Sequence, residues 1–258
     1  MPLSVSVRDL NFTVVAEPLT PAAFRPFGDV VQNPRPDILP SPSHTTESLR
    51  AAISPPLAHP PVVANQGTAI KYPQVSQPRD LYAQARSRRP SLPQTSIFQC
   101  AARRLSGPAG NQFPVAVLER HPFTTQMFCP LGADDAAASA RYLVVVAPSG
   151  PPGEADAGLP VPQDGEGLPG RGLPDVQRLK AFVATGAQAV TYSAGTWHAP
   201  MVALGREGTA LDFVVTQFAN GVGDEDCQEV VFDGRGRGAV VVEVPRALTG
   251  QIALGPRL

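Results

Sequence analysis

The sequence predicts one domain over residues 1–258 with a mainly β fold, a sandwich or barrel that carries one or two short helices. Short apolar segments rich in β-branched residues recur along the chain, and turn residues end each of them. Hydrophobic residues make up 43% of the 258, which is enough for a sizeable core. The chain carries no glycine-rich dinucleotide or phosphate-binding fingerprint, which disfavours a fold of alternating strands and helices.

The expected elements follow from local patterns. Pro21 to Phe24 predicts one helical turn with Thr20 as its cap. A longer helix is expected from Pro174 to about Ala184, because Asp175 can cap its start and apolar residues recur there at helical spacing. Strands are expected at residues 12–16, 28–32, 97–103, 114–119, 124–128, 141–147, 187–192, 211–217, 228–232 and 239–244.

Proline is concentrated in two stretches of the chain. Residues 33–93 hold 12 of the 30 prolines, and residues 148–174 hold 7. We therefore expect two Pro-rich inserts, at residues 33–62 and 148–174. The second is also rich in glycine, so we expect a mobile loop that cannot hold a regular strand ladder. Neither insert is expected to carry chemistry.

Charge and hydropathy exclude several classes of protein. Lys and Arg number 21 against 22 Asp and Glu, which disfavours binding to nucleic acid. Apolar runs are too short for a membrane helix, and polar residues interrupt any secretory signal. We expect a soluble, cytoplasmic protein with no nucleic-acid or membrane partner. The final tripeptide Pro256-Arg-Leu258 resembles a peroxisomal address, so the peroxisome is the weaker alternative.

A histidine turn suggests a cupin-like barrel. Gly195-Thr-Trp-His198 has the G-x-x-H form with which cupin barrels place a histidine at the mouth. The first cupin element should offer H-x-H, but Phe123 stands where the second histidine would follow His121. The chain has only four histidines, two of them in the first insert, so a three-His metal centre cannot be assembled. A divalent ion could still be held by His121 and His198 with Glu119 or Asp212, and the spacing selects no metal.

Five blocks resemble, in order and spacing, the ureidoglycolate lyase family of allantoin breakdown. They are residues 19–31 (LTPAAFRPFGDVV), 65–72 (NQGTAIKY), 118–126 (LERHPFTTQ), 174–182 (PDVQRLKAF) and 196–198 (TWH) with 211–214 (LDFV). The resemblance runs from about residue 12 to residue 232. The longer connection before residue 65 is similar to that of fungal members. The resemblance implies a cupin-like barrel, a homodimer and conversion of (S)-ureidoglycolate to glyoxylate and urea. It also associates nickel with bacterial members.

The reaction needs a base for the substrate hydroxyl, an acid for the departing urea nitrogen and a cation for the carboxylate. Glu119 and His121 stand two apart and would share one face of a strand, with Arg120 facing away. We expect Glu119, His121 and His198 to be catalytic. The alternatives are a surface Glu-Arg pair before a turn and a core histidine beside Trp197.

The remaining candidates bind or orient. Lys71 and Arg103 are the candidate cations for the carboxylate, and Tyr72 is weaker because it faces away from Lys71 on a strand. Arg103 could instead protect a solvated strand edge. Gln126 can offer its amide to urea or be an ordinary strand residue. Asp212, in an apolar strand, is expected to orient His198.

Other functions stay open at this point. A ureidoglycolate amidohydrolase would release ammonia from the same substrate. A non-catalytic cupin-like binding protein would explain the missing metal ligands. A metal oxygenase is disfavoured because only His121 and His198 survive as imidazole ligands. We also expect a homodimer, because the strand at residues 239–244 is mostly valine and carries no Lys, Arg or Pro to protect an exposed edge.

Overall fold

The computed structural model describes residues 3–7, 10–54, 57–132, 140–163, 168, 170–234 and 238–249. The chain divides into two compact units, a larger one of Met1–Val30 with Pro78–Leu258 and a smaller one of Val31–Gln77. This division is finer than the single domain predicted over residues 1–258. The smaller unit contains the whole of the insert expected at residues 33–62.

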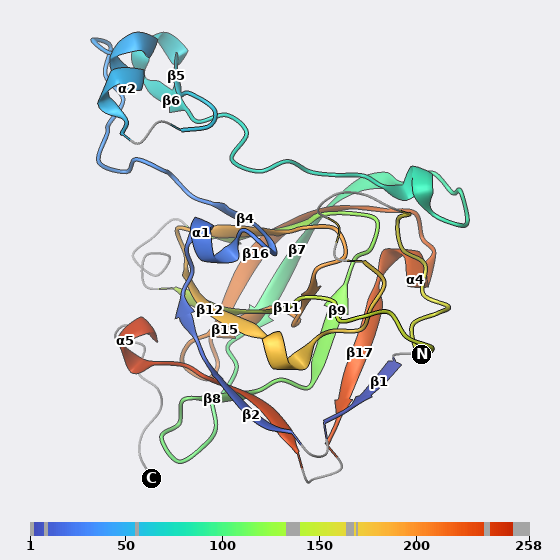
Figure 1. The fold of residues 1–258 in the computed structure, drawn as a ribbon. Helices are drawn as coiled ribbons and strands as arrows, with labels where there is room; N and C mark the ends of the chain where they lie inside the picture. Colours follow the sequence, from blue (N-terminus) through green and yellow to red (C-terminus); the bar gives the residue numbers. More distant parts are fainter. Residues whose placement is uncertain are drawn as a thin grey trace. The chain divides into compact units, whose positions relative to one another are not determined.

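Three sheets build the larger unit (Figure 1). The first runs in the order β1 (Leu3–Ser6), β17 (Gln228–Asp233), β9 (Val117–Arg120), β14 (Trp197–His198), β11 (Arg141–Ala147), β12 (Lys180–Thr185) and β3 (Glu17–Pro18), and β15 (Val202–Leu204) also pairs with β11. The second has the order β4 (Gly28–Val31), β13 (Ala189–Tyr192), β10 (Gln126–Leu131), β16 (Ala210–Ala219) and β7 (Leu92–Ala101). The third is β2 (Asn11–Val15), β18 (Ala239–Glu243) and β8 (Gln112–Pro114).

The first sheet is covered on both faces, and alternate residues of its strands enter two different cores. On one face Val144 and Phe182 pack with Phe128 and Phe213 of the second sheet. On the other face the core includes strand residues of the first and third sheets: Leu118, Val145, Val183, Trp197, Val240 and Val242. The mainly β, cupin-like architecture expected from the sequence is confirmed.

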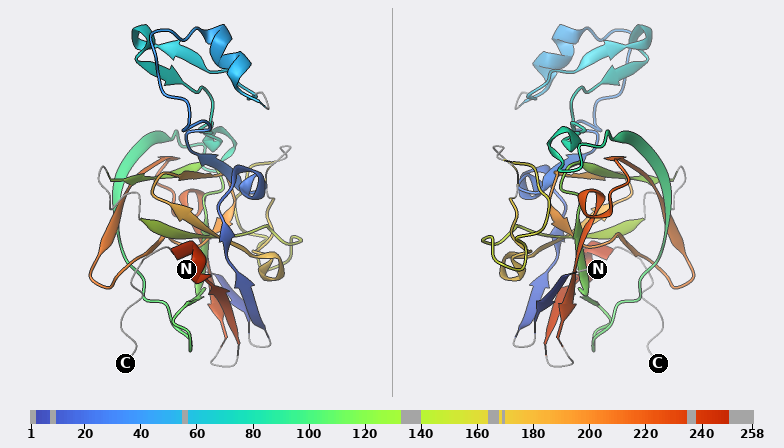
Figure 2. Two further views of the ribbon diagram at one scale, coloured as in Figure 1. Left: turned by 90° about the vertical axis from the view of Figure 1, so that its left-hand side faces the viewer. Right: turned by 90° about the vertical axis from the view of Figure 1, so that its right-hand side faces the viewer.

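The ends of the chain meet in the sheets. β1 pairs in parallel with β17, and β2 pairs in parallel with β18. The blue and red strands lie side by side in both views of Figure 2. The fold of the larger unit is therefore closed by its first and last strands.

The helix predicted from Pro174 to about Ala184 is wrong. Asp175 does cap a turn, its side chain accepting a hydrogen bond from the backbone N–H of Gln177, but the turn is the short 3₁₀ helix η3 (Val176–Arg178). Residues from Lys180 onward form β12, which pairs with β11 and β3. Both faces of β12 are buried, so its apolar residues fill positions that also match a helical spacing.

The other helices are short. α1 (Pro21–Phe24) begins as expected, with the Thr20 side chain accepting from the N–H of Ala23. α4 (Gly223–Asp226), α5 (Arg246–Thr249) and the 3₁₀ turn η2 (Tyr82–Gln84) complete the described helices of the larger unit. No helix in the described part of the chain is long and apolar enough to cross a membrane.

The smaller unit contains α2 (Thr46–Ala52), η1 (Asn65–Gly67) and the hairpin of β5 (Val62–Ala64) with β6 (Ala69–Lys71). Thr45 and Ser48 form a reciprocal capping box at the start of α2. The first Pro-rich insert thus holds a defined helix. In the second insert the described residues form turns and one isolated bridge, Ser149 with Pro174, and no strand.

The edge predicted at residues 239–244 is wrong. β18 lies between β2 and β8, and Val240 and Val242 are buried. Its run of valines reflects an internal position and not an edge that awaits a partner. β7 is instead an edge strand, and the side chains of Leu92 and Ile97 are 69% and 59% exposed.

Candidate active site

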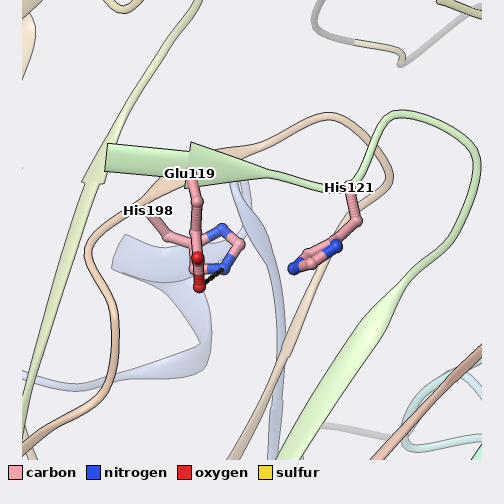
Figure 3. A group of neighbouring side chains, drawn as sticks. All are labelled: Glu119, His121 and His198. Carbon is pink, nitrogen blue, oxygen red and sulfur yellow. Dashed lines mark ion pairs between the residues drawn. The ribbon is translucent and has the colours of Figure 1, made fainter. Parts of the chain in front are cut away.

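Three titratable side chains converge on the face of the first sheet that packs against the second sheet. Glu119 on β9 lies opposite His198 on β14 in the strand register, and His121 follows the end of β9. Figure 3 shows the three side chains directed toward one another. One ligand atom from each lies within 4.8 Å of the others. The sequence therefore predicted the three residues that the fold brings together, and we name them the Glu-His-His cluster.

Backbone contacts fix both imidazole rings. The Nδ1 atom of His121 lies 2.6 Å from the carbonyl oxygen of Asp226, and that of His198 lies 2.9 Å from the carbonyl oxygen of Thr196. Because a carbonyl only accepts, each Nδ1 carries the hydrogen and donates it. The Nε2 lone pairs are left for the cluster, and both Nε2 atoms are buried without a hydrogen-bond partner.

The turn before His198 is also tied to His121. Gly195 has a φ of +77°, the left-handed conformation that glycine adopts without strain. Its N–H donates a hydrogen bond of 2.8 Å to the carbonyl oxygen of His121. The G-x-x-H turn thus joins the two halves of the cluster through the backbone.

Burial sets the protonation of the cluster. It raises the pKa of Glu119 to about 7, and the neighbouring Glu229 carboxylate adds to the increase. It lowers the pKa of His121, and it lowers the pKa of His198 to about 3 with a further contribution from His121. Near neutral pH both imidazoles are uncharged, and Glu119 is divided between its acid and carboxylate forms.

The cluster fits a divalent transition metal. The orphaned Nε2 atoms of His121 and His198 and the Glu119 carboxylate form a two-histidine, one-carboxylate donor set. The backbone carbonyls that accept from Nδ1 are the outer contacts that usually orient metal-binding histidines. Glu119, and not Asp212, is the carboxylate that joins the two histidines.

Two residues beside the cluster were missed by the sequence analysis. The ring of Tyr192 stacks on that of His198, with centroids 4.0 Å apart. The thiol of Cys227 lies 4.0 Å from Oε2 of Glu119, and burial raises the pKa of this thiol to about 12. Neither residue belongs to a recognisable motif, and only the pairing of β13 and β17 with their neighbours could have placed them.

Gln126 lies next to this group. It is opposite Tyr192 in the register of β10 and β13. Its Nε2 donates a 2.6 Å hydrogen bond to Oε1 of Gln217, a residue the sequence did not single out. Its Oε1 is buried and has no hydrogen-bond partner. An acceptor is thus free to receive an N–H group.

The two predicted cations are exposed in the structure. Arg103 is exposed, and its guanidinium stacks over Phe113 at 5.5 Å. Lys71 and Tyr72 belong to the smaller unit, where Lys71 is exposed at the end of β6 and the Tyr72 hydroxyl is buried without a partner. Their roles stay predictions.

Asp212 is half-buried on β16, and its Oδ1 has no hydrogen-bond partner. The two ring nitrogens of His198 face the Thr196 carbonyl and Glu119. The Thr196 carbonyl therefore fills the orienting role that the sequence suggested for Asp212.

Three further arginines, Arg86, Arg88 and Arg171, line a cavity of about 710 Å³ in the larger unit. Phe123, two residues after His121, forms part of its wall. The Glu-His-His cluster does not line it. The sequence analysis did not consider these arginines, because two lie in a loop and one lies in the second Pro-rich insert.

Comparison with known proteins identifies relatives over most of the chain. A family model described as ureidoglycolate lyase matches residues 11–237. A ureidoglycolate lyase of Schizosaccharomyces pombe is 36% identical over 220 residues, covering 83% of this chain and 89% of the relative. That of Saccharomyces cerevisiae is 34% identical and covers 79% and 84%, and that of Burkholderia mallei is 30% identical and covers 79% and 81%. With its sequence blocks, its fold and these relatives in agreement, the chain belongs to the ureidoglycolate lyase family.

Proposed function

We propose that this protein is a ureidoglycolate lyase that cleaves (S)-ureidoglycolate to glyoxylate and urea in purine catabolism. The observation that carries the proposal is the Glu-His-His cluster, in which two neutral imidazoles and a carboxyl group of pKa about 7 meet in a buried site. The family relationship supports the same substrate.

The reaction breaks the bond between the carbinol carbon and the urea nitrogen. A base removes the hydroxyl proton, the oxygen becomes the glyoxylate carbonyl, and an acid protonates the departing nitrogen. A buried neutral imidazole has a free Nε2 lone pair for the first step. The protonated form of Glu119 can supply the second proton because its pKa lies near the working pH.

A divalent ion, nickel by the resemblance to bacterial members, would be held by Glu119, His121 and His198. When bound, it would polarise the substrate oxygen that develops negative charge. The ion and the proton-transfer roles use the same Nε2 atoms and the same Glu119 carboxyl group. Elemental analysis of protein purified without a His-tag, together with activity before and after a chelator, distinguishes the two.

The substrate groups remote from the scissile bond need partners as well. We assign the carboxylate to Lys71 and Arg103, with Tyr72 as a weaker contact. We assign the urea N–H groups to Gln126, whose free Oε1 is a suitable acceptor. A hydrogen bond between the substrate carboxylate and either cation would contribute about 1.5–3 kcal/mol to binding.

One experiment tests the function. Purified protein is incubated with (S)-ureidoglycolate, and glyoxylate, urea and ammonia are measured. Equal amounts of glyoxylate and urea are expected. Ammonia in place of urea would identify a ureidoglycolate amidohydrolase. Binding of the substrate without glyoxylate would identify a non-catalytic binding protein.

We further propose a homodimer located in the cytoplasm. The exposed apolar side chains Leu92, Ile97 and Phe98 on the edge strand β7 support association with a second copy. The tripeptide Pro256-Arg-Leu258, on which the peroxisomal alternative depends, lies outside the described residues. A fusion of a fluorescent protein to the amino end reports the compartment: diffuse signal is expected, and puncta lost on removal of the tripeptide would assign the peroxisome.

A further inference from the structure

Arg120 is a buried charge in the middle of the active-site strand. It stands between Glu119 and His121, is 0% exposed and projects to the opposite face of the first sheet. Burial lowers the pKa of its guanidinium to about 10. The proposed reaction gives this residue no part, although it lies within the most specific sequence block.

The guanidinium of Arg120 holds the second Pro-rich insert. Its Nη2 donates to the carbonyl oxygen of Arg171 at 2.7 Å, and its Nη1 donates to that of Gly170 at 2.8 Å. Its Nε donates to Oε1 of Gln228 on β17 at 2.8 Å. The partners are uncharged oxygens set around a planar fork, an arrangement that a lysine cannot satisfy.

The same guanidinium reaches the strand that carries His198. It lies over the ring of Trp197 with 4.4 Å to the centroid, and the indole N–H of Trp197 donates to the carbonyl oxygen of Gly172 at 3.0 Å. Arg120, Trp197 and residues 170–172 therefore form one connected group, which we call the outer clamp. On β9 the clamp residue Arg120 is next to Glu119, and on β14 the clamp residue Trp197 is next to His198.

The strand pair beneath the clamp is short. β14 has two residues, and only His198 with Glu119 is in register between β14 and β9. This pair and the backbone hydrogen bond from Gly195 to His121 link the two segments beside the cluster, whose atoms must hold their separation to about half an ångström. The clamp supplies a further link between the same strands on the other face of the sheet.

We propose that Arg120 is a positioning residue, which fixes the separation of Glu119, His121 and His198 by clamping Trp197 and residues 170–172 to the outer face of β9 and β14. The second Pro-rich insert thereby contributes to the site, against the expectation from its composition. The inference about catalysis depends on the proposed function, and the inference about geometry does not.

Variants can separate positioning from stability. Arg120→Lys keeps the charge and loses the fork, and Arg120→Met also loses the charge. Gly172→Ala displaces the backbone of residues 170–172 and leaves Arg120 unchanged, because a Cβ at this position would overlap the carbonyl oxygen of Gly150. Gly158→Ala is the matched control in the same insert, since a Cβ at that position meets nothing within 4 Å. Val183→Ala, in the core on the clamp side, is the control for lost stability.

Three readouts are compared: the free energy of unfolding, the emission of Trp197, which is the one tryptophan of the chain, and the affinity for Ni²⁺ by calorimetry. We expect Arg120→Lys and Gly172→Ala to shift the Trp197 emission and to lower Ni²⁺ affinity about ten- to a hundredfold. The value of kcat should fall by a similar factor with KM changed less than threefold. Gly158→Ala and Val183→Ala should leave emission, Ni²⁺ affinity and kcat unchanged.

The proposal is overturned if folded Arg120→Lys keeps the wild-type Trp197 emission and Ni²⁺ affinity. It is also overturned if Val183→Ala loses as much Ni²⁺ affinity and kcat as Arg120→Lys does. If Arg120→Met fails to fold, Gly172→Ala and Arg120→Lys still decide. If the wild-type protein makes no glyoxylate, the proposed function fails, while emission and Ni²⁺ binding continue to test the clamp.

Discussion

Glu119 occupies surroundings that oppose its negative charge, and this has a consequence for activity. If the protonated carboxyl is the general acid, kcat/KM should fall as pH rises through about 7, the pKa of Glu119 in the free protein. Glu119→Gln should lower kcat/KM by about 10² or more and abolish that alkaline decline. A pH profile of kcat/KM for both proteins checks this. An unchanged profile in the variant would remove Glu119 from the acid role.

The same pKa affects stability with a definite sign. A carboxyl whose pKa is raised from 4.5 to about 7 on folding stabilises the protein fully below pH 4.5, and the contribution is lost as pH rises through 7. Glu119→Gln should therefore be more stable than the wild type at pH 8, by on the order of 2 kcal/mol, and the difference should shrink toward pH 4. Urea denaturation at the two pH values measures it.

The histidines should respond differently from the binding residues. His121→Ala should lower kcat about 10²-fold or more with KM little changed. If His198 is a metal ligand, added divalent ion will partly restore His198→Ala, whereas a lost acid or base is not restored in this way. Steady-state kinetics with and without Ni²⁺ distinguishes the two roles.

Lys71 is assigned to the substrate carboxylate, so Lys71→Ala should weaken substrate binding about tenfold to a hundredfold. The value of kcat should change much less. The exposed Lys180 of β12 offers a matched control, and Lys180→Ala should keep the wild-type KM. Wild-type KM in Lys71→Ala would move the carboxylate to another cation.

The residues that the sequence predicted best are those whose geometry depends on near neighbours. Glu119 and His121 follow from the alternation of a strand, and His198 follows from a glycine turn. Tyr192, Cys227 and Gln217 reach the site only through pairing with distant strands, which no local pattern encodes. The burial of Arg120 was also hidden, because its hydrogen-bond partners include backbone oxygens some 50 residues away and the side chain of Gln228.

At the level of elements, the largest error has the same origin. A strand buried on both faces is apolar at consecutive positions, so residues 176–183 matched helical spacing although they form η3 and part of β12. The edge predicted at residues 239–244 failed because a bare run of valines is typical of both an exposed and an internal strand. Most other strands were predicted near their observed positions, since turn residues mark their ends.

The strand assignment predicts the effect of core mutations in β12. Phe182 is buried between the first and second sheets, and Phe182→Ala should cost about 3–5 kcal/mol of unfolding free energy. Thr185, the last residue of β12, is only half-buried, and Thr185→Ala should cost about 1 kcal/mol or less. Urea denaturation of both variants checks the contrast.

For the whole molecule, the proposed dimer can be tested at the edge strand β7. If a second copy covers this edge, placing a charge there with Ile97→Lys should convert the dimer to a monomer. Light scattering should then give a mass near 27.1 kDa for the variant and about twice that for the wild type. Val75→Lys, at an exposed position of the smaller unit, is the matched control and should keep the mass of the wild type. A wild-type mass near 27.1 kDa would refute the dimer itself.

The pairing of first and last strands also determines when the protein can fold. β1 and β2 leave the ribosome first, but their partners β17 and β18 are made more than 200 residues later. Until those residues are made, β1 and β2 lack these partners, and apolar residues of β2 such as Phe12 and Val14 lack the core they pack against. Contacts between segments so far apart in sequence close slowly, so we expect the pairing of β1 and β2 to be a late step of folding.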